Sequence, residues 1–573
     1  AAVATEITAE EMTGSSALTN MNLDSSVWTV GQDTAWQYQG VTEDDETLGV
    51  YTGTGYLPQL TVFKDNGNET LSVTKIDLLQ QTDDEDGKTY YLIYNAENLK
   101  AFRDKVNGGE TDANGRLMAN IDLNPGYTFH EDGSYTYSGE GDAPGVQSWE
   151  PIGNYINYLR YTGTFDGNNK TVSGVYINNT SNLYNGLFGV VRDGAIKDLG
   201  VINSYIQSGA NSYAGGIAGG VEDTSVTNCY NTGTVSANGE YSTVGGVVGD
   251  LSFTNSKAEN CYNTGAVSAL GSTSYVGGVV GYSYRDAVIQ DCYNTGTVSG
   301  NYYIGGVAGF LNESEVENCY NAGAVHAIGH SMNLGGVAGY VWYNSSVANS
   351  YNTGTVSGTG NGGVAGSIYN SSVTNCYYLE DSASNGIYSG SGEAAALSVE
   401  EIEDTGNNGL LAKLVSGSGS GVWNETLSAV TNWEYGKPAV QPVLSWQQVI
   451  ENAPVYTVTI PEKATAGGDA VSVTMHAGAL RTNQQVAVRV AADNDFNLYY
   501  GGNTSSDSIR YNAYVNGGST ALTAGALVLS GGNMQSSASP ASASLTFAAS
   551  GTPKFSGDYT GTITFTVSVE NAA

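Results

Sequence analysis

Two short phrases recur about every thirty residues in the middle of this chain, between residues 185 and 378. The first phrase is Gly-Gly, then two aliphatic or small residues, then a further Gly; after a divergent copy at Asn185, intact copies begin at Gly215, Gly245, Gly277, Gly305, Gly335 and Gly362. The second phrase is Asn-Cys-Tyr-Asn-Thr-Gly or a variant of it, placed around Cys229, Cys261, Cys292, Cys319, Ser350 and Cys376. A period of this length is typical of stacked supersecondary units and not of a globular core.

The residue types within one repeat favour strands and tight turns. Short runs rich in Val, Thr and Ser alternate with Gly and Asn, and no apolar spacing has a helical period. One repeat would form a coil of three short strands that is unstable alone: about five buried aliphatics stabilise it by about 1.5–3 kcal/mol each, whereas ordering costs about 1–2 kcal/mol per residue. Neighbouring coils must supply the remaining burial and hydrogen bonds. The repeat therefore predicts a parallel β-solenoid with coils about 4.8 Å apart.

The repeated glycine pairs need a physical reason, because glycine in a strand costs about 0.5–1 kcal/mol relative to alanine. Either a positive φ at a corner or the close approach of a neighbouring backbone would supply one. An Asn closes each second phrase, and Asn both tolerates a left-handed turn and can hydrogen-bond along a stack of coils. These residues are Asn231, Asn263, Asn294, Asn321 and Asn352.

Together the two phrases resemble the GLUG repeat of large bacterial surface proteins. The resemblance extends upstream to Trp149–Gly153, Tyr161–Asn168 and Gly174–Ile177, which are similar to the start of such an array, and it covers roughly residues 90 to 446. It implies a β-helical exported segment, of a kind seen in adhesin-like proteins and also ahead of some secreted peptidase domains. It implies no catalytic residue within the repeats.

The charge balance disfavours several classes of partner. The 573 residues include 20 basic and 56 acidic residues, which give a net charge of −36. Binding to nucleic acid needs clustered Lys and Arg, so neither nucleic acid nor an anionic membrane surface is expected as a partner. Charged residues make up only 13% of the chain and tyrosines number 40, a composition that suits export and contact with sugars. No apolar run approaches the length of about 18 residues that spans a membrane, and the start at Ala1 favours a processed form or a fragment.

The length predicts two to four units, and the first of them has an internal counterpart. Residues 1–63 are expected to be the C-terminal remnant of an upstream repeat unit, or else an N-terminal cap. Residues 64–90 would be a polar connector, whose acidic run at 83–87 lacks the ligand spacing of a calcium loop and is interpreted as a solvated turn. The first unit resembles the segment that follows the repeats. Three stretches match in the same order: Thr8–Met12, Trp28 and Tyr56–Leu60 correspond to Ser398–Ile402, Trp423 and Val440–Leu444.

Residues 91–184 are predicted to hold a capping helix and the first solenoid coils. Asn95 can cap the helix, and a glycine pair ends it. Such a helix would close the open end of the solenoid core, as terminal caps must. The residues on its apolar face are Leu99, Phe102 and Val106.

The rest of the chain is predicted to form three further segments. Residues 185–378 would be the GLUG-repeat β-solenoid, and residues 379–453 its closing segment and a linker. Residues 454–573 alternate apolar and polar side chains between turn residues, which predicts an antiparallel β-sandwich of Ig-like architecture. The expected fold class is thus all-β, with one helical cap.

The five cysteines occupy one repeat position and should stack as a column. Adjacent coils would bring their α-carbons within disulfide range, but parallel side-chain directions are poor for the bond, and a straight row cannot surround a tetrahedral metal ion. Buried free thiols are therefore favoured, with one or two disulfides or a metal site as alternatives. His326 and His330 lack the helix and the Glu of a zinc peptidase motif and are interpreted as loop residues.

Catalysis is not expected in this chain. Polysaccharide lyases and hydrolases with β-helical folds need neighbouring carboxylates, often together with an Arg or Lys base. Acidic residues of the array, such as Asp250 and Asp291, fall at different repeat positions and should not meet in one cleft. Glu313, Glu315 and Glu317 alternate along one strand, where exposure to solvent is expected. No catalytic residue, metal ion or cofactor is predicted.

One column of residues is a candidate ligand-binding site. If each Cys faces inward, strict alternation turns the adjacent Tyr outward, and the result is an aromatic stripe that could meet an extended polysaccharide or a protein strand. An aromatic ladder that only stabilises the solenoid explains the same residues. The column comprises Tyr230, Tyr262, Tyr293, Tyr320, Tyr351 and Tyr377.

The sequence therefore predicts a non-catalytic, extracellular protein of the bacterial cell surface or cell wall. Its role would be adhesion or display, through contact with extracellular glycan or with a surface protein of a host or bacterium. Two alternatives stay open: an accessory region of a secreted peptidase or polysaccharide-active enzyme, and a structural spacer.

Overall fold

The computed structural model describes the chain from residue 78 onwards apart from short gaps, and it divides the chain into two compact units, 1–76 and 77–573. The gaps are 84–85, 140–141, 156–157, 179–180, 330–332, 431–433, 435–436, 449–454, 461–462, 481–483, 493, 503, 505–506, 535–537, 557 and 572–573, and only the backbone is described at 455 and 571. Before residue 78 the description is limited to the backbone of β1 (Trp28–Val30), β2 (Trp36–Gln39), β3 (Val50–Gly53) and β4 (Pro58–Leu60).

The backbone pairing in the first unit agrees with the internal similarity in the sequence. β1 pairs with β4 in antiparallel fashion, with Trp28 opposite Leu60, and β2 pairs with β3. In the matched segment after the repeats, Trp423 and Leu444 form an antiparallel bridge of the same kind. The first of the three matched stretches and the connector up to residue 77 lie outside the described residues, so the origin of this unit stays a prediction.

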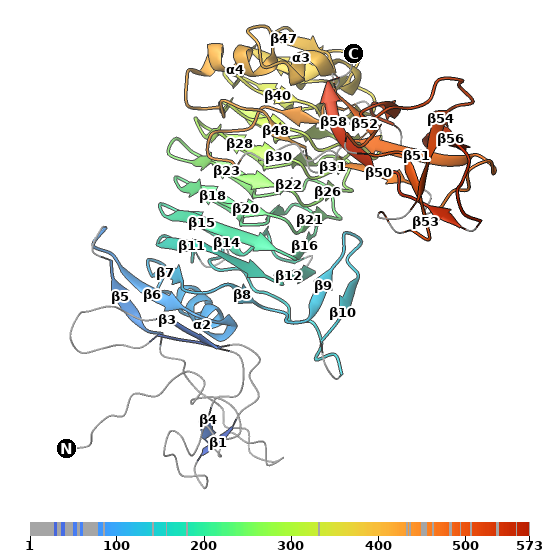
Figure 1. The fold of residues 1–573 in the computed structure, drawn as a ribbon. Coiled ribbons are helices and arrows are strands. Elements are labelled where there is room, and N and C mark those ends of the chain that lie inside the picture. Colours follow the sequence, from blue (N-terminus) through green and yellow to red (C-terminus); the bar gives the residue numbers. More distant parts are fainter. Residues whose placement is uncertain are drawn as a thin grey trace. The chain divides into compact units, whose positions relative to one another are not determined.

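The repeats of the second unit wind into a parallel β-solenoid of about seven coils, whose strands form four ladders (Figure 1). Each strand pairs with the equivalent strand one repeat further along; for example, Val235 lies opposite Val267. The predicted parallel β-solenoid is thereby confirmed. The prediction of three strands in each coil was wrong. The coils between residues 225 and 369 hold five strands each, because the glycine-rich phrase contributes to two ladders and a left-handed residue directly before each Cys position divides the first ladder into two short strands.

The first ladder contains the cysteine and tyrosine positions. It comprises β11 (Thr164–Ser173), β15 (Ala195–Ile202), β19 (Ser225–Thr227), β20 (Tyr230–Asn231), β24 (Lys257–Glu259), β25 (Tyr262–Asn263), β29 (Val288–Gln290), β30 (Tyr293–Asn294), β34 (Glu315–Glu317), β35 (Tyr320–Asn321), β39 (Ser346–Ala348), β40 (Tyr351–Asn352), β44 (Ser372–Thr374), β45 (Cys376–Leu379) and β47 (Ala394–Leu397). The second ladder comprises β12 (Tyr176–Asn178), β16 (Tyr205–Ser208), β21 (Thr234–Ala237), β26 (Val267–Ala269), β31 (Val298–Gly300), β36 (Val325–Ala327) and β41 (Val356–Ser357).

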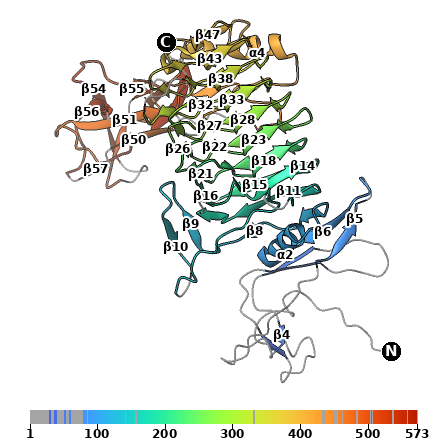
Figure 2. The ribbon, with the colours of Figure 1, turned by 180° about the vertical axis from the view of Figure 1, so that it is seen from behind.

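The remaining two ladders contain the glycine-rich phrase. The third comprises β13 (Tyr184–Asn185), β17 (Tyr213–Gly215), β22 (Thr243–Gly245), β27 (Tyr275–Gly277), β32 (Tyr303–Gly305), β37 (Asn333–Gly335) and β42 (Asn361–Gly362). The fourth, which Figure 2 shows along the stack, comprises β14 (Phe188–Arg192), β18 (Ala218–Glu222), β23 (Val248–Ser252), β28 (Val280–Tyr284), β33 (Ala308–Asn312), β38 (Ala338–Trp342), β43 (Ala365–Tyr369) and β46 (Ile387–Ser389).

The glycine pairs are explained by close backbone approach and not by positive φ. A Cβ on Gly245 would lie 1.9 Å from the carbonyl oxygen of Val248, and one on Gly246 would lie 2.1 Å from that of Gly278. Neither glycine has a positive φ. The same contacts recur in each coil, so the chain turns tightly between the third and fourth ladders only where a side chain is missing.

The asparagines that close the second phrase form a buried hydrogen-bonded ladder. The Nδ2 of Asn231 donates to the Oδ1 of Asn263 at 2.9 Å, and the pattern continues through three further pairs to Asn352. The predicted bonding along the stack is confirmed. The left-handed backbone, however, lies three residues earlier, at Asn228, Asn260, Asp291, Asn318, Asn349 and Asn375.

The predicted helix is α2 (Ala96–Asn107), and Asn95 caps it by accepting a hydrogen bond from the backbone N of Asn98 at 2.9 Å. Its buried residues are those predicted, Leu99, Phe102 and Val106. The same part of the chain holds β5 (Gln80–Thr82), β6 (Thr89–Ile93), β7 (Asn114–Leu117), β8 (Ile121–Asp122), β9 (Tyr127–Phe129) and β10 (Tyr135–Tyr137). β7 and β8 pair in parallel with β11, so this region leads directly into the first ladder.

Residues 394–447, which we call the closing segment, end the solenoid. Besides β47, the segment holds α3 (Val399–Glu403), α4 (Leu410–Ser418), β48 (Ser428–Ala429) and β49 (Val440–Gln441); the short η2 (Glu380–Ser382) precedes it. Its apolar side chains form one buried cluster with two tyrosines of the first ladder, Tyr320 and Tyr351. The segment therefore packs on the outer surface of the last coils as well as continuing the stack.

The C-terminal residues form two antiparallel sheets, as the alternating pattern predicts. One holds β50 (Val455–Thr459), β51 (Val471–Gly478), β53 (Asn497–Tyr500), β54 (Ser508–Val515), β56 (Ala541–Ser550) and β57 (Tyr559–Thr560), and the other holds β52 (Gln484–Val490), β55 (Leu527–Gly531) and β58 (Phe565–Asn571). Val473 of the larger sheet and Val488 of the smaller sheet share a buried cluster. Among the described residues, no helix has the length and apolar character needed to cross a membrane.

Candidate functional site

The predicted tyrosine column exists as a stacked ladder. Adjacent rings from Tyr230 to Tyr351 have centroids 4.7, 4.8, 5.0 and 5.1 Å apart, with planes within 5° of parallel. This spacing follows the distance between coils, since each Tyr lies directly opposite the next in register. The rings therefore stabilise the stack of coils, as the ladder interpretation predicts.

The closing segment covers much of this ladder. Tyr320 and Tyr351 are buried, with 2% and 0% of their surface exposed. The hydroxyl of Tyr351 donates to the carbonyl of Pro442, and Trp446 stacks on Tyr262, with ring centroids 6.2 Å apart. The expectation of a continuous open stripe is therefore wrong for Tyr320 and Tyr351, because a later segment of the chain packs over them.

The other members of the column are half-buried and locally engaged. The ring of Tyr293 also lies under Trp446, at 5.7 Å between centroids. The hydroxyl of Tyr377 bonds the Oδ1 of Asn375 at 2.5 Å, and the ring of Tyr230 rests against Gly200. A binding role for these four tyrosines stays a prediction.

The cysteines form the predicted column of buried thiols. All five, Cys229, Cys261, Cys292, Cys319 and Cys376, are free and no more than 1% exposed. Each has equivalent surroundings; for example, the thiol of Cys292 donates to the carbonyl of Gln290 at 3.1 Å and accepts from the backbone N of Cys261 at 3.4 Å. Burial raises the pKa of the Cys292 thiol well above its ordinary value. These thiols fill the core and have no route to a ligand.

A second set of aromatic side chains flanks the glycine-rich phrase in the sequence. These side chains lie on the outer side of the third and fourth ladders. We call this set the aromatic face, and it comprises Tyr275, Tyr282, Tyr303, Phe310, Tyr340 and Trp342. The alternation along each strand places these residues. On β33, for example, Leu311 is fully buried, and the preceding Phe310 is turned outward and half-exposed.

The rings of the aromatic face touch both within and between coils. Tyr303 lies 5.2 Å from Phe310 and 5.1 Å from Tyr340, and Phe310 lies 5.4 Å from Tyr340, all between centroids. Each tyrosine of the third ladder leans onto the residue of the fourth ladder one coil further along. The result is a continuous, half-exposed aromatic surface across three coils.

Polar groups border this surface. The Nδ2 of Asn312 donates to the hydroxyl of Tyr282 at 3.3 Å. Burial raises the pKa of Tyr282 to about 12, so its hydroxyl stays protonated and can both donate and accept hydrogen bonds. Apolar ring faces bordered by oriented hydroxyl and amide groups are typical of sites that bind polar organic ligands.

The aromatic face was not predicted, although its signal is present in the sequence. An aromatic residue follows the last Gly of three glycine-rich phrases, at Tyr282, Phe310 and Tyr340. Two of these rings are followed directly by an apolar residue, Leu311 or Val341, and alternation with an inward-facing Leu or Val would have predicted that the rings point outward. The prediction instead used the tyrosine of the second phrase, which gives the column that begins at Tyr230.

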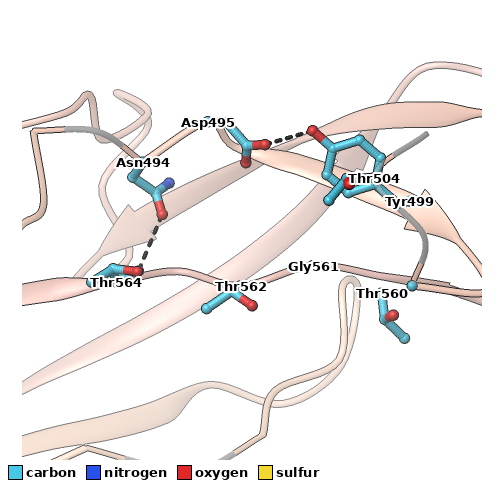
Figure 3. Close-up of a pocket in the computed structure, with 9 residues that line it drawn as sticks. Asn494, Asp495, Tyr499, Thr504, Thr560, Gly561, Thr562 and Thr564 are labelled. Atoms are coloured by element: carbon cyan, nitrogen blue, oxygen red, sulfur yellow. Dashed lines mark hydrogen bonds between the residues drawn. The ribbon is translucent and has the colours of Figure 1, made fainter. Parts of the chain in front are cut away.

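Other candidate groups are more isolated. His326 lies on β36 beside Ser357, with 2.5 Å between Nδ1 and Oγ, and His330 lies outside the described residues. In the C-terminal sheets, a pocket of about 320 Å³ is lined by Asp495, whose carboxylate accepts a hydrogen bond from Tyr499 at 2.6 Å (Figure 3). Neither place brings together groups with an evident chemical role.

Comparison with known proteins supports the repeat assignment. The GLUG motif family matches residues 210–236, 272–299 and 330–357. The chain therefore carries GLUG repeats folded as a β-solenoid, as the two phrases predict. A "Putative Gly-rich membrane protein" of Evansella cellulosilytica is 38% identical over 78 residues, which are 13% of this chain and 9% of that protein's length.

A solved structure of low similarity also aligns with this chain. It is the crystal structure of a putative immunoglobulin A1 protease from Bacteroides ovatus, which is 19% identical and has a TM-score of 0.38. The alignment covers 62% of this chain and 93% of that one.

Proposed function

We propose that this chain is a non-catalytic, extracellular protein of the bacterial surface, and that its solenoid presents the aromatic face to extracellular glycan. The observation that carries the proposal is the continuous row of half-exposed rings from Tyr275 to Trp342, with hydroxyl and amide groups at its edge. Sugar rings have an apolar C–H side and polar edges, so they match a surface of this composition.

Charge supports glycan over other polymers. The net charge of −36 disfavours nucleic acid, whereas a neutral polysaccharide meets no electrostatic barrier. The row follows the solenoid axis, and an extended polymer could contact successive coils at equivalent positions. Adhesion or display on the cell surface follows from such multivalent contact.

In this proposal helix α2 and the C-terminal sheets have supporting roles. Helix α2 caps the first coils, since the ring of Phe102 packs against Phe165 and Tyr161 at 5.7 and 6.1 Å between centroids. We infer an Ig-like sandwich for the two C-terminal sheets, an inference supported by the buried cluster that Val473 of one sheet shares with Val488 of the other. This module would work as a spacer or as a further contact domain.

A glycan array followed by calorimetry tests the proposal. The native chain should bind at least one class of extended polysaccharide, and the double variant Phe310→Ala/Tyr340→Ala should lose at least about tenfold in affinity, because about 1.4 kcal/mol or more of ring contact is removed. Tyr241→Ala is the matched control, since Tyr241 is 61% exposed and lies outside the face. The proposal fails if no glycan binds, or if the double variant binds as tightly as the control.

A further inference from the structure

The aromatic rows are interrupted at one coil. In the third ladder, Thr243 takes the place that Tyr213 and Tyr275 occupy in the neighbouring coils. In the fourth ladder, Asp250 pairs with Gly220 on one side and with Tyr282 on the other. We call the four residues at this interruption, Gly220, Thr243, Asp250 and Ser252, the notch, because smaller or acidic side chains stand there in place of aromatic rings.

Tyrosine rings flank the notch from both directions. Tyr184 and Tyr213 stack with centroids 4.7 Å apart and planes at 11°. The ring of Tyr184 lies over Gly220, where an added Cβ would be 2.6 Å from a ring carbon. Burial raises the pKa of Tyr184, Tyr213 and Tyr282, and the negative charge of Asp250 adds to each shift, so all three phenols lie within its electrostatic reach.

The Asp250 carboxylate has no cationic partner among the described residues. Its hydrogen bond comes from the hydroxyl of Ser252, which donates to Oδ1 at 2.6 Å. The nearby guanidinium groups of Arg160 and Arg192 instead approach the carboxylate of Glu222, at 3.6 and 3.5 Å. Burial first, and then the charge of Glu222, raise the pKa of Asp250 to about 7, while the bond from Ser252 opposes this shift. A half-buried carboxylate without a counter-charge costs free energy, which a bound cation would recover.

We propose that the notch binds an ammonium group carried by a glycan, with Asp250 as its counter-ion and the rings of Tyr213 and Tyr282 on either side. A carboxylate between aromatic rings is the arrangement that recognises ammonium groups through charge and cation–π attraction. The net charge of −36 also attracts cationic polymers. The inference rests on the proposed function, because the polymer that places its ammonium group here lies along the aromatic face.

The test compares two oligosaccharides of equal length on the full chain: N,N,N-trimethylglucosamine, which has a permanent positive charge, and N-acetylglucosamine, which is neutral. Calorimetric titration at physiological salt and slightly alkaline pH should give at least about tenfold tighter binding of the charged oligomer. Asp250→Asn should remove this preference without weakening the neutral oligomer, since Asn keeps the shape and the bond from Ser252. The control variant Asp286→Asn removes the same charge at an exposed position and should keep the preference for the charged oligomer.

The outcomes separate the two proposals. Equal binding of both oligomers, or a preference that survives Asp250→Asn, overturns the ammonium site. The aromatic face is still supported in that case if Phe310→Ala/Tyr340→Ala weakens the binding of both oligomers. An Asp250-dependent preference that the double variant does not weaken supports the notch and overturns the aromatic face as the glycan platform. Failure of both oligomers to bind overturns the ammonium site, while the glycan array still tests the face.

Discussion

The ring of Trp423 lies 5.7 Å from the ring of Tyr351, centroid to centroid, and joins the closing segment to the outer surface of the first ladder. Trp423 is 2% exposed, and it also lies 6.4 Å from Tyr320. This contact turns a tyrosine column that could have been a binding surface into an internal interface. The end of the solenoid is therefore sealed by a segment that folds back along it.

Trp423→Ala should release the closing segment. Removing a large buried aromatic side chain costs about 3–5 kcal/mol, which is comparable to the local stability of a short capping segment. We expect limited proteolysis to cut between residues 394 and 447 much faster than in the native chain. Trp446→Ala is the comparison, because Trp446 is 37% exposed and its loss should accelerate cleavage far less. Equal cleavage of the Trp423→Ala and native chains would show that the segment is held by other contacts.

Asn263→Ala should destabilise the solenoid, although the next residue in the sequence, Thr264, is exposed. Asn263 is fully buried, accepts from Asn231, and donates to Asn294 and to the carbonyl of Gly265. Its loss leaves buried partners unsatisfied, at about 1–3 kcal/mol for each group. We expect a loss of about 2–4 kcal/mol in the free energy of unfolding, measured by denaturant titration. Thr264→Ala, the neighbouring exposed control, should change it by less than about 0.5 kcal/mol.

The sequence predicted the solenoid well because its period and its alternation are local properties. The pairing of Tyr230 with Tyr262 and the burial of Cys229 both follow from a repeat of about thirty residues that brings equivalent side chains into one column. The Asn231 ladder follows from the same rule. The left-handed position could not be assigned, because Asn228 and Asn231 are both asparagines and only the backbone distinguishes them.

The candidate site was predicted less well, for a reason of tertiary structure. Alternation shows that Tyr320 and Tyr351 point out of the solenoid core, but it contains no information about what then covers them. The covering residues, such as Trp423, come from a later segment with no repeat. The packing of the closing segment decides which aromatic residues stay open. It covers part of the tyrosine column and leaves the aromatic face around Phe310 uncovered.

The buried thiols should be unreactive in the folded chain and should make it sensitive to alkali. Burial raises the pKa of Cys229, Cys261 and Cys292 well above 9.0, and that of Cys376 to about 12. The folded state keeps these protons when the unfolded state begins to lose them near pH 9, so stability falls as the pH rises above about 9, by up to about 1.4 kcal/mol per pH unit for each thiol. Thiol labelling at mildly alkaline pH should be slow without denaturant and complete with it. Rapid labelling of the folded chain would show that the column is open to solvent.

Asp250→Asn should stabilise the chain, and the size of the effect should depend on pH. The ordinary pKa of Asp is 3.8, and burial raises that of Asp250 to about 7 in the folded state, so the folded state binds the proton more tightly. The stability associated with that proton is present at low pH and is lost as the pH rises from about 4 to 7. Asn does not titrate and keeps the bond from Ser252. The variant should therefore match the native chain below about pH 4 and exceed it by about 2–4 kcal/mol above about pH 7.

Denaturant titrations of both chains across this pH range measure the difference directly. Asp286→Asn, at an exposed turn, should show a difference below about 0.5 kcal/mol throughout. A difference between the Asp250→Asn and native chains that does not change with pH would mean that the carboxylate is solvated and ionises normally. A difference that grows through the predicted window would show that the notch holds a carboxylate at the expense of stability, which is the pattern of a residue kept for binding.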